Sequence, residues 1–159
     1  MQAELQLEKI TEKEITRLLA GKHWKDIFIP QCKTGASYGG GTTILDAWVM
    51  PKSWVKPITG YEIKISRADF KRDRKWRYYL EYCHLFYFVT PHGLIAPYEV
   101  PEEAGLCYVT KNQQAIRTVK KAPFRWWHRI PIDVFQYVLM WRAKIVTQEE
   151  GGELRGTAD

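Results

Sequence analysis

Alternating apolar and polar side chains make residues 60–70 the most informative stretch of the chain. Tyr61, Ile63 and Ile65 are separated by polar residues, among them Glu62 and Lys64, and this period of two predicts a short β-strand. Glu62 and Lys64 then point to the same side of the strand, about 6–7 Å apart. The pattern therefore sets a carboxylate next to an ammonium on a strand that also carries isoleucines.

The rest of the chain reads as a mixture of helices and strands. Thr11 and Glu14 have the spacing of a capping box, which predicts a first helix that ends near Gly21. Ser66 is expected to cap a further helical turn, with Asp69 as its reciprocal partner. Apolar and β-branched runs predict strands at 27–29 (ending at Pro30), 42–50, 85–90, 106–109 and 115–121, and helices are predicted at 74–83 and 131–145.

One acid interrupts the β-rich run 42–50. Asp46 is expected to share its face of the strand with Ile44, Trp48 and Met50, and an acid on an apolar face is an informative exception. If this strand pairs antiparallel with the strand at 60–66 through the intervening loop, Asp46 lies beside Glu62 and Lys64.

Two acids and a lysine in such a position have a definite chemistry. Neighbouring carboxylates raise each other's pKa unless a cation neutralises them, and hard divalent ions prefer carboxylate oxygens. The convergence of Asp46, Glu62 and Lys64 therefore favours a metal site with a water beside it. The competing interpretation is a solvated edge strand on which Glu62 and Lys64 form a surface ion pair.

The residues around this spacing carry a family resemblance. An acid on one strand followed by Glu-x-Lys on the next, here Asp46 and then Glu62-Ile63-Lys64, resembles the signature of the PD-(D/E)XK nuclease superfamily. The wider sequence is similar to the MmcB-like DNA-repair family, which has relatives in phages and mobile elements. This similarity extends from about residue 11 to residue 123 and rests on segments 62–70, 73–76, 82–83, 86–88, 101–106 and 121–123.

The resemblance implies a restriction-endonuclease-like α/β (α+β) fold, in which helices flank a mixed central β-sheet. It also implies that Asp46, Glu62 and the carbonyl of Ile63 hold Mg²⁺ or Mn²⁺, and that Lys64 completes the catalytic set. The first helix of the superfamily often supplies a further acid, for which Glu14 is the best match and Glu12 the alternative. The competing interpretation makes both of them ordinary first-turn acids that the helix dipole favours.

Positive charge points to a polyanionic partner. The chain has a formal net charge of +6 and a pI near 9.2. One basic run lies over residues 64–77. A second, over residues 117–129, is interleaved with Phe124, Trp126 and Trp127, a combination that suits phosphates and unstacked bases. The competing interpretation is an apolar core or interface with a solvated basic rim. The residues expected to bind DNA are Ser66, Arg67, Lys71, Arg74, Lys75, Lys120, Lys121 and Arg125.

We therefore expect a single domain over residues 1–147, followed by a disordered tail at 148–159. The expected function is Mg²⁺- or Mn²⁺-dependent hydrolysis of DNA in repair, recombination or phage DNA processing. The alternative is a nuclease-like module that binds DNA or recruits a partner without cleaving. The sequence leaves open whether cleavage is endo- or exonucleolytic, and whether the DNA is duplex, single-stranded, branched or damaged.

Location and assembly follow from weaker signals. The three cysteines lack Cys-x-x-Cys spacing, and no apolar run reaches the length of a membrane span or a signal peptide. These features predict a cytoplasmic protein, of a bacterium or a phage-infected host, with DNA rather than a membrane as its partner. Trp126, Trp127 and the apolar last helix also leave room for a homodimer.

Overall fold

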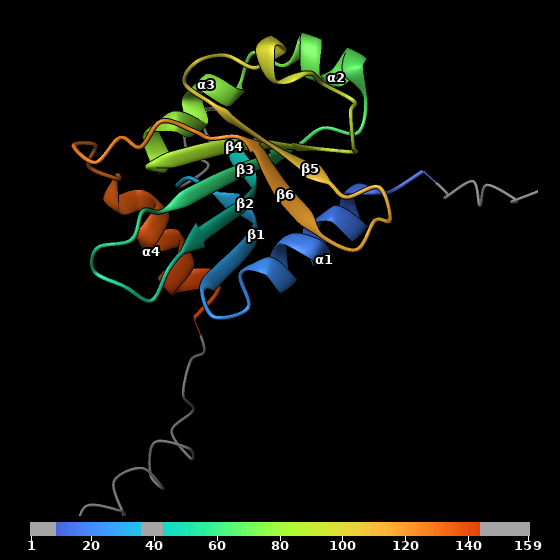
Figure 1. Cartoon of the computed structure of the whole chain (residues 1–159). Coiled ribbons are helices and arrows are strands. Elements are labelled where there is room, and N and C mark those ends of the chain that lie inside the picture. Colours follow the sequence, from blue (N-terminus) through green and yellow to red (C-terminus); the bar gives the residue numbers. More distant parts are fainter. Residues whose placement is uncertain (1–8, 36–42, 144–159) are drawn as a thin grey trace, which may run out of the picture.

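A six-stranded mixed sheet forms the centre of the computed structural model, which describes residues 9–35 and 43–143 (Figure 1). The strands lie in chain order: β1 (Ile27–Lys33), β2 (Ile44–Met50), β3 (Thr59–Ile63), β4 (Leu85–Thr90), β5 (Gly105–Val109) and β6 (Ile116–Lys120). Neighbouring strands are antiparallel except for the pairs β3–β4 and β4–β5, which are parallel. The predicted antiparallel pairing of β2 with β3 is confirmed, with Ala47 opposite Tyr61.

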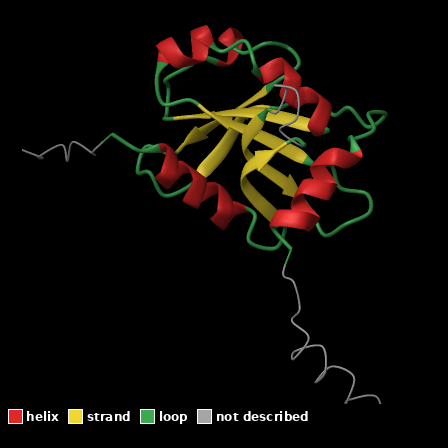
Figure 2. Cartoon of the chain, turned by 180° about the vertical axis from the view of Figure 1, so that it is seen from behind, coloured by secondary structure: helices red, strands yellow, loops and turns green. Residues whose placement is uncertain are grey.

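Helices cover both faces of this sheet (Figure 2). They are α1 (Glu12–Lys22), α2 (Arg67–Arg72), α3 (Trp76–Tyr79) and α4 (Ile132–Trp141), with 3₁₀ turns at Leu80–Tyr82 and Pro97–Glu99. The predicted mixed α+β architecture with a flanked central sheet is therefore confirmed. The expected tail at 148–159 lies outside the described residues.

Two apolar cores hold the helices on the sheet. On one face, α1 packs through Ile15 and Leu19 against a core that includes Val49 and Ile63. On the other face, α3 and α4 cover a larger core, built on aromatic and aliphatic residues that include Trp48, Trp76, Phe86, Phe88 and Val134. Because β3 alternates between these cores, Glu62 faces the α3 side while Tyr61 and Ile63 face α1.

The capping box predicted at the start of α1 is present in full. Thr11 Oγ1 accepts a hydrogen bond from the backbone N–H of Glu14, and Glu14 Oε2 accepts one from the backbone N–H of Thr11 at 2.8 Å. At α2 only half of the predicted box forms: Ser66 accepts from the backbone N–H of Asp69, whose carboxylate turns instead toward Lys64. Asp69 therefore contributes its carboxylate to the candidate site rather than to the capping box.

Several predicted boundaries are wrong. The strand expected over 60–66 ends at Ile63, and the helix expected over 131–145 ends at Trp141. Strand β1 continues through Pro30 to Lys33, which an edge position allows because the missing N–H then faces away from the neighbouring strand. The helix expected over 74–83 is one α-turn followed by a 3₁₀ turn. Carbonyls of this 3₁₀ segment accept hydrogen bonds from distant side chains, including Trp48 Nε1 on Tyr82, which compete with a regular helical ladder.

The three cysteines, Cys32, Cys83 and Cys107, are free and buried, and burial raises the pKa of the Cys83 thiol to about 12. No helix in the described ranges is long and apolar enough to span a membrane.

Candidate functional site

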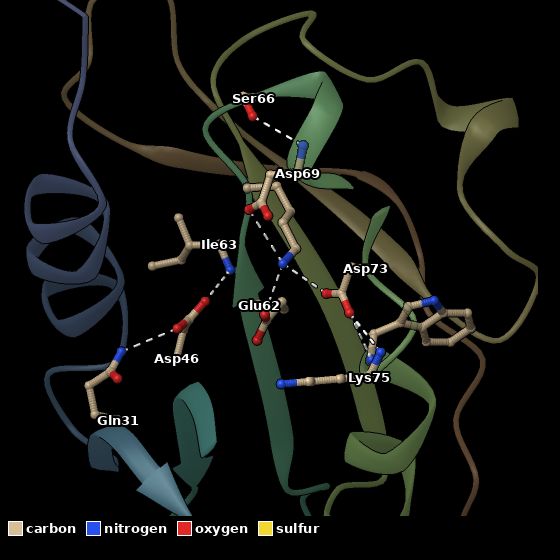
Figure 3. A network of polar contacts seen from close by, with 10 residues as sticks. Gln31, Asp46, Glu62, Ile63, Ser66, Asp69, Asp73 and Lys75 are labelled. Carbon is tan, nitrogen blue, oxygen red and sulfur yellow. Dashed lines mark hydrogen bonds and ion pairs between the residues drawn. The ribbon is translucent and has the colours of Figure 1, made fainter. Parts of the chain in front are cut away.

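Asp46 lies where the regular alternation of β1 and β2 breaks. Leu45 and Trp48, three residues apart, both enter the core under α3, so the strand shifts its facing at Asp46 instead of alternating as the sequence predicts. Across the ladder, Gln31 has a left-handed backbone with φ of 49°. The distortion lets Asp46 accept hydrogen bonds from Gln31 Nε2 at 3.2 Å and from the backbone N–H of Ile63 at 2.7 Å (Figure 3).

These two donors hold Asp46 in a largely buried position. Burial raises the pKa of its carboxyl, and the N–H group of Ile63 opposes this rise. The hydrogen bond to Ile63 also ties β2 directly to the end of β3, the strand that carries Glu62. The predicted convergence of Asp46 with the Glu-x-Lys strand is therefore present in the structure.

Glu62 is the acid of the site whose pKa is raised most by burial. Its residue is 8% exposed, and burial, reinforced by the neighbouring charge of Asp46, raises the pKa of its carboxyl to about 8. One oxygen, Oε1, accepts a hydrogen bond from Lys64 at 3.0 Å. The other, Oε2, is buried without a hydrogen-bond partner among the described residues. A buried carboxylate oxygen in this state has capacity for a further ligand.

Lys64 is held by three carboxylates at once. Its ammonium lies 2.8 Å from Asp73, 3.0 Å from Glu62 and 3.6 Å from Asp69. Burial disfavours the charge, but the hydrogen bond to Asp73 and the attraction of Glu62 outweigh it, so the pKa of Lys64 is raised. Lys64 is therefore a firmly charged ammonium at the end of β3, on the same side as Glu62.

Asp73 is a residue of the site that sequence reasoning missed. Its Oδ2 pairs with Lys64, while its Oδ1 accepts hydrogen bonds from the backbone N–H groups of Lys75 at 2.8 Å and Trp76 at 3.3 Å (Figure 3). The available signal was an aspartate directly before a helical segment, where a side-chain cap is expected. For Gln31 the sequence contains no comparable signal.

A hollow of about 430 Å³ opens above these groups. Its walls combine the buried ion cluster with exposed cations; the lining residues are Glu62, Lys64, Asp69, Arg72, Asp73, Arg74, Lys75 and Tyr79. Figure 3 shows the Lys75 side chain extending in the direction of Glu62. Burial and the nearby charge of Glu62 raise the pKa of Tyr79, which remains a neutral phenol. An acidic floor with a basic rim suits a phosphate group and a cation together.

Glu14 is not brought to this cluster. Its carboxylate is exposed and accepts hydrogen bonds from the backbone N–H and the hydroxyl of Thr11, both at 2.8 Å, and these bonds lower its pKa. Glu12 is exposed in the same first turn. Across the described ranges, no three histidine, cysteine, aspartate or glutamate residues are grouped so that they could hold a metal ion. The first helix therefore contributes a cap rather than a third acid.

The residues expected to bind DNA divide into two groups. Lys71, Arg74, Lys75 and Lys121 are exposed, and Arg74 and Lys75 line the hollow. The others make contacts within the protein. Ser66 caps α2, and Arg67 forms an ion pair with Glu99 while remaining about half exposed.

Lys120 and Arg125 are anchors of the fold. Lys120 donates to the carbonyls of Val100 at 2.6 Å and Pro101 at 2.8 Å. Arg125 Nη2 donates to the carbonyls of Leu80 and Cys83, both at 2.7 Å. Lys120 Nζ and Arg125 Nη2 are thus engaged with backbone carbonyls, which makes these two side chains poorly suited to grip a phosphate in this conformation.

The oxygen atoms at the cluster fit a hard cation that takes only a few of its ligands from the protein. Asp46 and Glu62 offer carboxylate oxygens, and Glu62 Oε2 lacks a hydrogen-bond partner in the described part of the chain. Ile63, whose backbone carbonyl is the expected third ligand, directly follows Glu62. Mg²⁺ commonly takes only one or two carboxylates and keeps several waters. Two acids and one carbonyl are therefore sufficient for such an ion, although they form no three-acid group.

Comparison with known proteins agrees with the fold and gives a family. A solved structure of a protein of unknown function from Silicibacter pomeroyi is similar, with a TM-score of 0.59 and 20% sequence identity over 98% of this chain and 94% of that one. No curated protein matches. The family model described as DNA repair protein MmcB-like matches residues 47–134, which include Glu62, Lys64 and Asp73 and begin one residue after Asp46. This match covers more than half of the sequence, and the chain therefore belongs to the MmcB-like family of DNA repair proteins.

Proposed function

We propose that the protein is a metal-dependent DNA nuclease that acts in DNA repair. The observation that carries this proposal is the buried carboxylate of Glu62, which has one unpartnered oxygen among the described residues and lies beside Asp46 and Lys64. Burying an ionisable group in this way costs stability unless a ligand uses it. The cationic rim of the hollow supplies the complementary attraction for a DNA phosphate.

In this proposal Asp46, Glu62 and the carbonyl of Ile63 hold Mg²⁺ or Mn²⁺. A bound divalent ion supplies Lewis-acid polarisation of a phosphate and lowers the pKa of water. Asp46 is oriented for this role by Gln31 and by the Ile63 N–H, which leave further lone pairs available on its two oxygens. The arrangement agrees with the acid-then-Glu-x-Lys order of the PD-(D/E)XK superfamily.

Lys64 is the group that we assign to the reacting phosphate. Its ammonium stabilises negative charge that develops on the phosphate oxygens, or orients the attacking water. Asp73 keeps this ammonium in place when Glu62 binds a cation, because it contacts Lys64 through one oxygen and the start of α3 through the other. Arg74 and Lys75 hold the flanking DNA backbone, which gives affinity with little sequence preference.

One observation favours a second candidate, a module that binds DNA without cutting it. Lys64 already neutralises Glu62, and no three acids of the described residues are grouped so that they could hold a metal ion. A site satisfied by its own lysine would not need a metal. This candidate predicts that DNA binding and thermal stability are both indifferent to divalent ions.

Cleavage and metal binding are tested together. Wild type and Asp46→Asn are incubated with plasmid, linear duplex and single-stranded DNA in Mg²⁺, Mn²⁺ or EDTA, and their melting temperatures are measured in the same buffers. The proposal predicts metal-dependent cleavage by wild type, and a rise in its melting temperature with Mn²⁺; both are lost in Asp46→Asn. Asp133→Asn, an exposed position at the start of α4, is the matched control and should behave as wild type.

Three outcomes would contradict the proposal in different parts: the cleavage itself, the role of Asp46, or the need for a metal. Wild-type protein without cleavage on all three substrates and without a shift in Mn²⁺ would support the non-cleaving module. Cleavage that persists in purified Asp46→Asn would remove Asp46 from the mechanism. Cleavage that is equally fast in EDTA would exclude the metal.

A further inference from the structure

Two loops far apart in the sequence expose tryptophan together with positive charge. The loop 51–58, between β2 and β3, carries Trp54, which is fully exposed, and the loop 121–131, before α4, carries Trp126 and Trp127, which are 73% and 65% exposed. Neither segment contains an acidic residue, whereas the exposed cations in them are Lys52, Lys56, Lys121 and Arg129. Indole rings and cations on an acid-free surface suit a ligand that is both aromatic and anionic.

A histidine joins these loops. His84 accepts a hydrogen bond at Nδ1 from the backbone N–H of Ile58, at 3.0 Å, and its Nε2 donates to the carbonyl of His128 at 3.2 Å. This pair of bonds requires the neutral imidazole with its proton on Nε2. Burial lowers the pKa of His84 and so favours that form. In Figure 1 the loop between β2 and β3 lies beside α4, at the same end of the sheet. His84 therefore ties the two loops together, and we call the pair of loops the indole platform.

The indole platform adjoins the hollow of the proposed active site. Arg125 donates to the carbonyls of Leu80 and Cys83, and the ring of His128 contacts the carbonyl of Glu81. Leu80 and Glu81 belong to the 3₁₀ turn that directly follows Tyr79, a residue that lines the hollow, and Cys83 comes directly after this turn. DNA bound in the hollow would extend past this turn to reach Trp126 and Trp127.

We propose that the indole platform binds unpaired bases, so that the substrate of the proposed nuclease is single-stranded DNA or a DNA end with an unpaired strand. In a duplex the faces of the bases are stacked on each other, whereas a single strand offers them to aromatic side chains. Trp126 and Trp127 meet edge to face, with ring centroids 5.9 Å apart at 88°, which leaves ring faces available. The exposed cations supply phosphate contacts, and Arg125 positions the loop. This inference rests on the proposed function for its substrate, but not for the binding itself.

Binding is measured in EDTA, so that it is independent of metal and cleavage. Fluorescence anisotropy with a labelled thymine oligonucleotide of about 15 nucleotides reports on stacking plus phosphate contacts, and a blunt duplex of the same length reports on phosphate contacts alone. We expect Trp54→Ala and Trp126→Ala each to weaken binding of the oligonucleotide by about 5- to 100-fold and to leave duplex binding nearly unchanged. Trp24→Ala is the matched control, since Trp24 is equally exposed and has Lys25 over its ring, but lies after α1.

Several results would overturn the indole platform as a base-binding surface. These are an unchanged affinity in both variants, an equal loss for oligonucleotide and duplex, or an equal loss in Trp24→Ala. Sedimentation that shows a dimer of the wild type dispersed by Trp126→Ala, with unchanged oligonucleotide affinity, would assign the surface to a second copy of the chain. Circular dichroism melting confirms that each variant is folded. Oligonucleotide binding that depends on the indoles, in a protein that never cleaves, would refute the nuclease and retain the platform.

Discussion

The buried carboxyl of Glu62 gives a quantitative prediction, because replacing it by glutamine removes its charge and keeps its shape. The pKa of this group rises from an ordinary value of 4.5 to about 8 in the folded protein. Between these values the folded state binds a proton that the unfolded state has released, so the free energy of unfolding falls as pH rises. Below pH 4.5 both states are protonated and the loss disappears, whereas above pH 8 the loss is complete.

The size of the effect follows from the same shift. One pKa unit corresponds to about 1.4 kcal/mol, so ionised Glu62 lowers the free energy of unfolding by at most about 5 kcal/mol above pH 8, and by about 3 kcal/mol at pH 7. The glutamine oxygen still accepts from Lys64, although it loses the charge attraction. We therefore expect Glu62→Gln to be more stable than wild type by about 2–3 kcal/mol at pH 8 in EDTA, and equally stable near pH 4.

Urea unfolding at a series of pH values, in EDTA throughout, measures this difference. Glu102→Gln makes the same chemical change at an exposed position and should change the stability little at any pH. The reasoning would be refuted by a Glu62→Gln protein that is less stable than wild type at pH 8, or by a difference that is the same at pH 5 and pH 9. Addition of Mn²⁺ should then stabilise the wild type and so reduce its stability difference from Glu62→Gln, because a bound cation stabilises the ionised carboxylate of Glu62.

Two further pairs of substitutions test the assignment of acids around the site. Asp73→Asn should lower the free energy of unfolding by about 1–3 kcal/mol, since it removes a buried charged partner of Lys64, and should slow any cleavage; Asp69→Asn should do less, because Asp69 is half exposed and 3.6 Å away. Urea unfolding and cleavage assays measure both, and equal effects would contradict the dominant role of Asp73. Glu14→Ala should lower the melting temperature slightly by loss of the capping box, and more than Glu12→Ala, while neither changes the cleavage rate. A large loss of cleavage in Glu14→Ala would return that acid to the catalytic set.

Local patterns were sufficient for much of the fold and for the centre of the site. The alternation around Glu62 and Lys64 correctly predicts that the two share a face, and the capping box at Thr11 correctly predicts the start of α1. These features depend on residues a few positions apart. The pairing of β2 with β3, which brings in Asp46, also joins elements that are close in the chain.

The remaining features depend on contacts that a local pattern cannot contain. Asp46 turns toward Ile63 because the ladder is distorted opposite Gln31, where the backbone is left-handed. The helix predicted over 74–83 gives way to a 3₁₀ turn whose carbonyls accept from Arg125, more than forty residues later. Lys120 and Arg125 were expected to bind DNA on the basis of their charge alone, whereas Lys120 Nζ and Arg125 Nη2 donate to backbone carbonyls in the structure.

The edge strand β1 has a consequence for how copies of this protein meet. Outer strands with unpaired backbone groups tend to recruit further strands and so to aggregate. Here Pro30 lacks the N–H group, Gln31 interrupts the extended backbone, and Arg142 donates to the carbonyls of both residues, at 2.9 and 3.3 Å. The middle of this edge therefore offers a poor template for strand addition. A β-sheet that continues across two copies through β1 is therefore disfavoured, and any contact between copies has to use another surface of the fold.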